Sequence, residues 1–287
     1  MIVQSEPLAD FLAAPSKLGQ EVSITGKWVP TKKSGFFRKS KESAGMIEEW
    51  EAIHQSASQH PGILSTEINH AIGQDAVLVH HTFKSPAAVE DYFASVATEH
   101  MAALTQVAKP ALHLVRGMQM PASMKAVMSA KVSGAAFGEY RYGYVKNDFQ
   151  RPDPKTAIQV TAKWVCKPGE SVEELSYWWQ RVGTDAYDLE KGLVRFEVYK
   201  VAGEEALIIH ETFTDTKELQ FHLSKGTAHR YKKDIDKIAA PDAYFFRGPV
   251  SWTIRTYSKF LKLPATYTTQ GSNHTHPAGS MSDGTIK

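Results

Sequence analysis

The sequence predicts a mixed α+β protein made of two copies of one domain. Three observations predict this fold: an internal repeat, the same order of strand-like and helix-like segments in each copy, and an ordinary globular composition. The 287 residues are 42% hydrophobic and 22% charged. A chain of this length has room for about two domains, each with a core of its own.

The internal repeat consists of three blocks in the same order. A shift of 130 positions pairs residues 62–83 with 192–213 without a gap, and seven of these 22 positions are identical. The Lys-Trp-Val sequence ending at Val29 matches the one ending at Val165, and the Arg-Gly pair at Gly117 matches the one at Gly248. Because the blocks keep their order, they indicate a duplicated domain.

Each copy begins with a strand and a helix. Apolar and polar residues alternate over 22–29 and over 158–165, and a period of two is typical of a strand. The helix is clearest in the second copy, where Ser171 can cap it and Glu174 stands three residues later. This is a capping-box pattern, and it precedes an apolar stripe that begins at Leu175.

A hairpin, a second helix and a last strand complete each copy. Short turns containing Gly73 or Gly203 join the hairpin strands. The expected hairpin strands are 63–69 and 77–83 in the first copy, and 193–199 and 207–213 in the second. The second helix is expected over 85–96 and 215–223, and the last strand over 112–115 and 244–246. The element order is therefore β-α-β-β-α-β.

This order is the ferredoxin-like plan, an antiparallel sheet with both helices on one face. The other face stays bare, and two such sheets can cover each other. We therefore expect two ferredoxin-like βαββαβ domains that form an intramolecular dimeric α+β barrel. The expected division is an N-terminal extension (1–21), domain 1 (22–120), a linker with structure of its own (121–156), domain 2 (157–250), and a C-terminal extension with a mobile tail (251–287).

The second copy resembles the antibiotic-biosynthesis monooxygenase family of the dimeric α+β barrel group. The resemblance is carried by 192–199, by the strand 208–213 with its internal Glu211, and by 218–229, which reads as a helix, a His, a short loop and a His. It covers roughly 158–250. Copy one departs from the pattern, since His81 replaces Glu211 and Tyr92 replaces His222, although His100 can align with His229. The resemblance implies a cofactor-independent monooxygenase that oxidises a quinol or a phenolic polycyclic molecule.

Such an oxidation needs a base that deprotonates the substrate, and histidine is suited to this near neutral pH. The candidate bases are His222 and His229, with Gly226 expected to break the helix between them. The candidate orienting partners are Glu211 and His210, which should point to opposite faces of their strand.

Each of these residues also has a structural alternative. His222 can close the end of a helix, Glu211 can form a salt bridge, and His210, which is repeated as His80, can be a satisfied core histidine. An aromatic group suited to a flat substrate consists of Trp164, Trp178, Tyr199 and Phe213, and such a stripe is also ordinary core.

The sequence favours no cofactor and no metal. It contains no phosphate-binding glycine loop, no dinucleotide fingerprint and no zinc helix. Haem degradation is a minor alternative, because the axial histidine of that branch would fall where this chain has Lys232 and Lys233. A second alternative is a non-catalytic small-molecule-binding or stress-response protein of the same fold.

The expected partner is a small aromatic molecule. A net charge of +2 offers no basic excess for a nucleic acid. Membrane association is not expected, because no apolar run approaches the length that spans a bilayer. The single cysteine, Cys166, fits the reducing cytoplasm. A homodimer of the tandem unit is left open.

Overall fold

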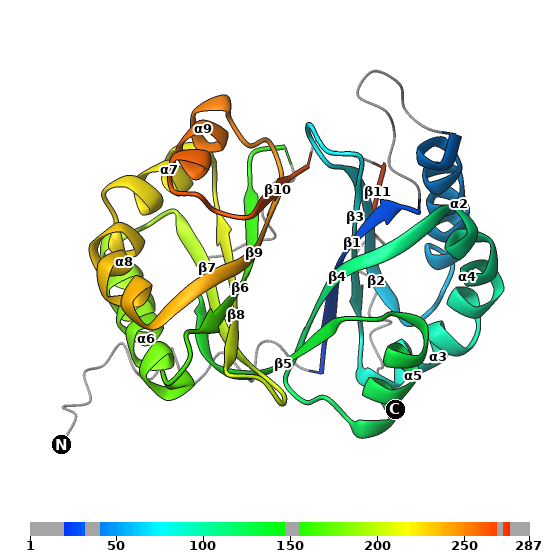
Figure 1. Cartoon of the computed structure of the whole chain (residues 1–287), viewed down its shortest axis with the longest axis horizontal. Coiled ribbons are helices and arrows are strands. Elements are labelled where there is room, and N and C mark those ends of the chain that lie inside the picture. Colours follow the sequence, from blue (N-terminus) through cyan, green and yellow to red (C-terminus); the bar gives the residue numbers. More distant parts are fainter. Residues whose placement is uncertain (1–19, 32–40, 147–154, 269–271, 276–287) are drawn as a thin grey trace, which may run out of the picture. The chain divides into compact units, whose positions relative to one another are not determined.

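The computed structural model describes residues 20–31, 41–146, 155–268 and 272–275. These residues form two compact units. The N-terminal unit comprises the described residues of 20–115 together with 120–135 and 272–275, and the C-terminal unit comprises 116–119 and the described residues of 136–268. Both units combine helices with a β-sheet, so the chain has the mixed α+β fold that the sequence predicts (Figure 1).

The N-terminal unit has the strand order β4-β1-β3-β2-β11. The pairs of β1 with β3, β3 with β2, and β2 with β11 are antiparallel. Its elements along the chain are β1 (Val22–Pro30), α2 (Lys41–Ala57), β2 (Ile63–His70), β3 (Val77–Phe83), α3 (Pro86–Ala94), α4 (Val96–Val107), β4 (Ala108–Gly117), α5 (Ala122–Lys131) and β11 (Ser272–Thr275).

The C-terminal unit has the strand order β10-β9-β6-β8-β7-β5. All of its pairs whose direction is known are antiparallel except that of β10 with β9, which is parallel. Its elements are β5 (Ala135–Val145), β6 (Ile158–Cys166), α6 (Val172–Leu189), β7 (Leu193–Val201), β8 (Ala206–Phe213), α7 (Thr216–Ser224), α8 (Thr227–Ile238), β9 (Ala239–Arg247), α9 (Trp252–Phe260) and β10 (Ala265–Tyr267).

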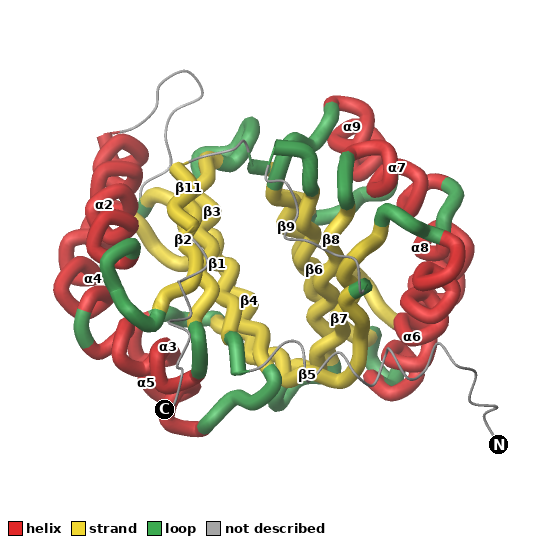
Figure 2. The backbone as a smooth tube through the Cα atoms, turned by 180° about the vertical axis from the view of Figure 1, so that it is seen from behind, coloured by secondary structure: helices red, strands yellow, loops and turns green. Residues whose placement is uncertain are grey.

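In each unit the main helices cover one face of the sheet, which we call the helix side (Figure 2). An equivalent pair of tryptophans lies on the helix side of each unit. Trp28 of β1 meets Trp50 of α2 with ring centroids 5.3 Å apart, and Trp164 of β6 meets Trp179 of α6 at 5.6 Å. Because neighbouring residues of a strand point to opposite faces, these contacts assign a side to strand residues that pair without a register shift.

The element order confirms the expected strands and shows what sequence patterns missed. Helices α4 and α8 were not expected, and β4 and β9 are longer than the segments at 112–115 and 244–246. The expected linker contains α5 and the whole of β5, and four residues of the expected tail form β11. The rest of that tail after Thr275, and the N-terminal extension up to Gly19, lie outside the described residues.

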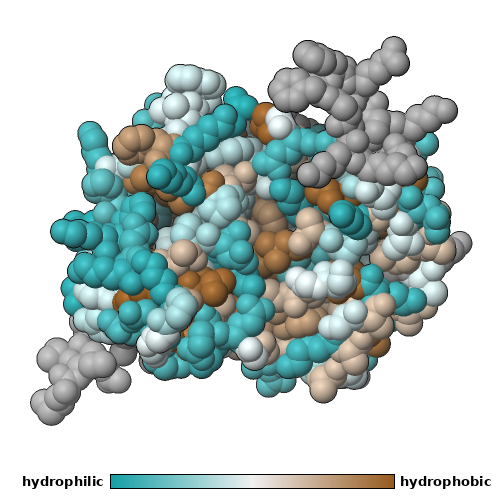
Figure 3. Space-filling model, viewed as in Figure 1, coloured by the Kyte–Doolittle hydropathy of each residue, from teal (hydrophilic) through white to brown (hydrophobic). Residues whose placement is uncertain are grey.

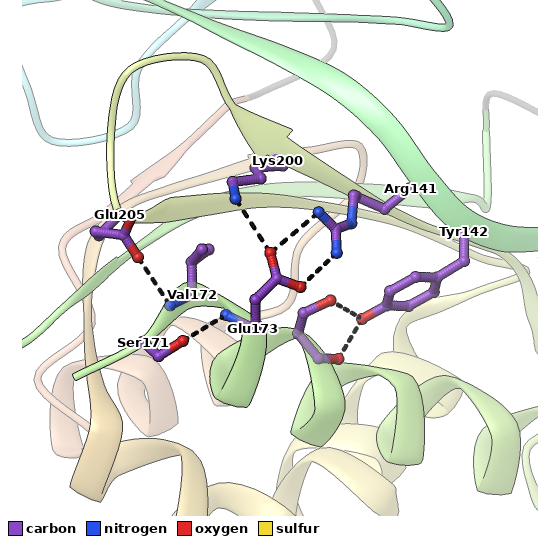
Figure 4. A network of polar contacts seen from close by, with 8 residues as sticks. Arg141, Tyr142, Ser171, Val172, Glu173, Lys200 and Glu205 are labelled. Carbon is purple, nitrogen blue, oxygen red and sulfur yellow. Dashed lines mark hydrogen bonds and ion pairs between the residues drawn. The ribbon is translucent and has the colours of Figure 1, made fainter. Parts of the chain in front are cut away.

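Helix α6 begins in a dense polar network (Figure 4). The Ser171 hydroxyl accepts a hydrogen bond from the amide of Glu173 at 3.1 Å, so the predicted cap is present. The Glu205 carboxylate accepts a hydrogen bond from the amide of Val172 at 3.0 Å. The Glu173 carboxylate also accepts hydrogen bonds from Arg141 at 2.6 Å and from Lys200 at 3.1 Å. These contacts tie the start of α6 to β5 and to the β7–β8 hairpin.

The described residues expose few large apolar side chains. On the face shown in Figure 3, hydrophobic residues form small groups among hydrophilic ones. The most exposed large ones of the described residues are Trp252 and Phe260, both on α9. None of the described helices is long and apolar enough to cross a membrane.

Candidate active site

The predicted residues His222 and Glu211 meet on the helix side of the C-terminal unit. His222 lies in the last turn of α7 and is 1% exposed. Glu211 lies on β8 opposite Val160, on the face that carries Trp164. The Nε2 atom of His222 and the Oε1 atom of Glu211 form an ion pair at 3.1 Å. The last turn of α7 and the alternation along β8 therefore bring the two side chains together.

A third residue, Glu190, completes this cluster and was not predicted. It follows α6 directly and is 2% exposed. Its Oε2 atom accepts a hydrogen bond from Nδ1 of His222 at 2.7 Å, and its Oε1 atom accepts from the amide and the hydroxyl of Thr227 at 2.6 and 2.7 Å. We call Glu190, His222 and Glu211 the carboxylate–histidine triad.

Gly226 makes room for the triad where α7 ends and α8 begins. A Cβ atom at this position would lie 2.6 Å from Oε1 of Glu190 and 2.7 Å from the Cα atom of His222. Gly226 is the N-cap of α8, so the predicted break between His222 and His229 is present. Because a new helix begins here, the amide of Thr227 has no acceptor within α8, and Glu190 accepts its hydrogen bond.

The triad keeps the imidazole protonated. Burial opposes the charge on His222, but the neighbouring carboxylates of Glu211 and Glu190 outweigh it and raise the pKa of His222 to about 10. For Glu190, burial is likewise outweighed by the bonds from His222 and Thr227, and its pKa is lowered. Two carboxylates then flank one imidazolium, so the triad as a whole carries one negative charge and can accept one proton.

Aromatic rings surround the triad. The ring centroid of Phe213 lies 5.2 Å from that of His222. Burial, together with the charge on Glu211, raises the pKa values of Tyr144 and Tyr244 well above the usual range of tyrosine. Trp164 contacts Tyr244 with centroids 6.1 Å apart. The buried negative charge therefore lies among flat apolar side chains.

The other predicted residues lie elsewhere in the same unit. His229 is exposed on α8. His210 points to the face opposite the helices, where its Nδ1 atom is 3.0 Å from the hydroxyl of Thr161. Tyr199 is on this same opposite face and donates to Glu197 at 2.7 Å. Trp178 packs against Tyr231 of α8, at 5.9 Å between ring centroids. Of the predicted set, the structure therefore groups His222, Glu211 and Phe213, and Trp164 lies further along the same face against Trp179 and Tyr244.

The matching positions of the N-terminal unit hold a different set. The shift of 130 positions places His60, Tyr92 and His81 where the triad has Glu190, His222 and Glu211. His81 lies opposite Ile24 of β1, and its ring is 5.5 Å from that of Tyr92. Burial, and then the charge on His54, lower the pKa of His81 to about 3. The triad is thus replaced by two histidines and a tyrosine, of which His81 is held neutral by burial.

His100, which the sequence aligned with His229, bonds to Ser56 at 3.0 Å. The repeated His80 contacts Thr25 at 2.9 Å, and this bond has its counterpart in that of His210 with Thr161. Both of these repeated His–Thr pairs are satisfied within their own sheets.

The described residues contain no group of three or more His, Cys, Asp or Glu side chains that could hold a metal ion. Lys232, where an axial histidine of the haem branch would be expected, forms an ion pair with Asp236. The residues at this position therefore do not fit a haem ligand.

Comparison with solved structures shows a likeness of fold. A Fusobacterium nucleatum protein described as a "putative monooxygenase" superposes with a TM-score of 0.51 at 10% identity, covering 90% of this chain and 99% of that one. A protein of the same description from Lactobacillus acidophilus has a TM-score of 0.47 at 10% identity, covering 79% and 92%. An anthrone oxidase-like protein has a TM-score of 0.48 at 11% identity, covering 77% and 88%. No protein-family model and no curated protein sequence matches the chain.

The duplication itself contained the signal for Glu190. Position 190 lies just before the gapless block of the repeat, and its counterpart is His60. All three triad positions differ between the two copies. The C-terminal copy has two glutamates and a histidine, and the N-terminal copy has two histidines and a tyrosine. Side chains that change together in two copies of a fold are candidates for mutual contact.

Proposed function

We propose that the protein is a cofactor-independent monooxygenase that oxidises a quinol or phenol on the helix side of the C-terminal unit. The observation that carries the proposal is the carboxylate–histidine triad, a buried cluster that is one proton short of neutrality. A group that takes a proton from a phenol in an apolar setting produces the electron-rich phenolate, which can reduce oxygen directly.

Within the triad, Glu211 is the proton acceptor and His222 is its positioning residue. Both ring nitrogens of His222 already face carboxylates, so its proton is held and the imidazole itself is not the base. Glu190 fixes His222 from the other side, through a contact that also secures the start of α8. This arrangement reverses the roles that the sequence suggested for His222 and Glu211.

The reaction balances without a further reductant. A phenol with a free para C–H bond and one O₂ molecule give the para-quinone and one water. The phenol proton passes to Glu211, the phenolate gives an electron to O₂, and the resulting radicals join as a peroxide on the para carbon. Loss of the ring proton and cleavage of the O–O bond leave the quinone oxygen on the ring, and the other oxygen leaves as water.

The test is oxygen uptake by the purified protein with a panel of phenols and polycyclic quinols that have a free C–H bond para to a hydroxyl group. Glu211→Gln should reduce the rate by about 10²–10⁴-fold, the usual contribution of a positioned base. Glu174→Gln on the exposed side of α6 is the matched control and should leave the rate unchanged. An absence of oxygen uptake above the buffer rate with every substrate, or an unchanged rate in Glu211→Gln, rules the proposal out.

A binding protein without catalysis is the second candidate, and the positions of the histidines favour it. His229 is exposed, and His222 is fully engaged in ion pairs. This candidate predicts that phenols bind without oxygen uptake, and that Glu211→Gln alters the affinity alone.

The finer features of the fold belong to the same proposal. We propose that the two units are ferredoxin-like domains whose bare sheet faces shield each other in an intramolecular barrel. The repeated element order supports this proposal. Cys166, the one cysteine of the chain, is unpaired, which supports a reducing compartment such as the cytoplasm.

A further inference from the structure

The helix side of the N-terminal unit contains a cluster of buried nitrogen atoms without hydrogen-bond partners among the described residues. They are Nε1 of Trp28, Nε1 of Trp50, both ring nitrogens of His81 and Nδ1 of His113. None of these four side chains is more than 4% exposed. Nearly all buried polar groups in native proteins are satisfied, so a group of exceptions requires an explanation.

The four rings are neighbours. Trp28 lies 5.3 Å from Trp50 and 5.4 Å from His113 between ring centroids, and Trp50 lies 6.4 Å from His81. They come from β1, α2, β3 and β4, so the sheet and a covering helix both contribute. We call this set the tryptophan–histidine cluster.

A glycine fits one of these rings against the sheet. A Cβ atom at Gly26 of β1 would lie 2.3 Å from two atoms of the His113 ring. In the repeat, Gly26 matches Ala162 and His113 matches Tyr244, and the latter two are also paired in register on β6 and β9. The N-terminal unit thus has an imidazole in the place of a phenol ring.

The cluster is uncharged and rich in donors. Burial lowers the pKa values of His81 and His113 to about 3, so both imidazoles are neutral near pH ~7. Each indole can only donate, and a neutral imidazole donates through one nitrogen and accepts through the other. Trp28, Trp50 and His81 therefore offer at least three N–H groups, more than the acceptors that the cluster itself supplies.

We propose that the tryptophan–histidine cluster binds an uncharged aromatic ketone or quinone, whose carbonyl oxygen accepts hydrogen bonds from the indole and imidazole N–H groups. The four side chains are aromatic, which favours a flat aromatic ligand, and its carbonyl oxygen adds an acceptor to a cluster that has more donors than acceptors. A charged ligand would find no opposite charge among these four side chains. This site lies in the other unit from the carboxylate–histidine triad and does not depend on the oxidation proposed there.

A matched pair of ligands tests the site. Acetophenone and ethylbenzene have nearly the same shape and differ in the carbonyl group. Isothermal titration calorimetry should show that acetophenone binds at least about tenfold more tightly, because ethylbenzene leaves the buried donors unsatisfied. Indole N–H resonances of Trp28 and Trp50, assigned through the single Trp→Phe variants, should shift with acetophenone more than with ethylbenzene.

Variants locate the binding. Trp50→Phe keeps an aromatic ring and removes one donor, and His81→Phe removes both ring nitrogens. Each should reduce the preference for acetophenone severalfold while ethylbenzene binding is retained, and the circular-dichroism melting curve of each variant confirms that it is folded. Trp252→Phe on the exposed α9 is the control and should change neither affinity.

Three results would overturn the proposal. They are equal affinities for the two ligands in the wild-type protein, a preference that survives both Trp50→Phe and His81→Phe, and loss of acetophenone binding in Glu211→Gln. The last result would place the ligand in the C-terminal unit. Because the oxidation is measured by oxygen uptake and depends on Glu211, failure of either proposal leaves the other standing.

Discussion

At the scale of single residues, His222 shows how two neighbouring carboxylates determine the protonation state of a buried histidine. Burial alone would remove its proton, as burial does for His81 in the other unit. The carboxylates of Glu190 and Glu211 reverse the outcome, because they stabilise the imidazolium that burial disfavours. The same helix-side setting therefore gives a protonated histidine in one unit and a neutral one in the other.

Replacement of one carboxylate should release this proton. In Glu211→Gln the largest charge that stabilises the imidazolium is lost, so the pKa of His222 should fall from about 10. NMR titration of the His222 ring resonances from about pH 6 to 11 measures this pKa in the variant and in the wild type. The ordinary pKa of a histidine is about 6.5. Glu174→Gln serves as the control. A His222 titration that is the same in Glu211→Gln and wild type would contradict the electrostatic account.

Residue types and strand alternation predicted part of this site. Glu211 and His222 became candidates through the family resemblance of 208–213 and 218–229, and opposite faces for His210 and Glu211 follow from the period of two. Glu190 was missed, because it lies just outside the gapless block of the repeat and its role depends on where the chain turns after α6; the sequence points to it only through its replacement by His60 in the other copy. The exposure of His229 was also hidden, since it depends on which side of α8 packs against the unit.

At the scale of elements, the polar network at the start of α6 should contribute measurably to the free energy of unfolding. Ser171→Ala removes the side-chain acceptor at the N-cap and should lower the free energy of unfolding by about 1 kcal/mol. Urea unfolding followed by circular dichroism gives the value. Ser133→Ala, at an exposed turn position, should change it by less than about 0.5 kcal/mol. Equal effects of the two substitutions would mean that the cap contributes nothing.

Helices α4 and α8 were not predicted, although the sequence of α8 contains a helical signal. Its buried residues Tyr231, Ile235 and Ile238 have helical spacing, and the residues between them are mainly Lys and Asp. Apolar residues on one face and charged residues on the others are the pattern of an amphipathic helix, so α8 could have been read from the sequence. The strands of the repeat were easier to predict, because nearly every second residue in them is buried and apolar.

At the scale of the whole molecule, the two units should respond to pH in opposite ways. His222 has a folded pKa of about 10, above its ordinary value, so its contribution is complete below about pH 6.5 and is lost as pH rises to about 10. His81 and His113 have folded pKa values of about 3, below their ordinary value. Their effect is the reverse, and stability falls as pH drops from about 6.5 towards 3.

Melting temperatures measured by calorimetry at about pH 5, 7 and 9 test this pair of effects. His81→Phe should flatten the decline on the acid side, and Glu211→Gln should flatten the decline on the alkaline side. A variant that flattens the opposite side, or that leaves the whole profile unchanged, would show that these buried histidines do not set the pH limits of the fold.

Strand β11 determines when the N-terminal unit can be completed during synthesis. It pairs antiparallel with β2, so residues near the end of the chain supply the neighbour of a strand made near its beginning. At ordinary translation speeds the ribosome needs roughly 10–40 s to advance from one to the other. For that interval β2 is an open sheet edge in the nascent chain, able to pair with other polypeptides. Protection of this edge by a chaperone therefore matters most while the second half of the protein is still being translated.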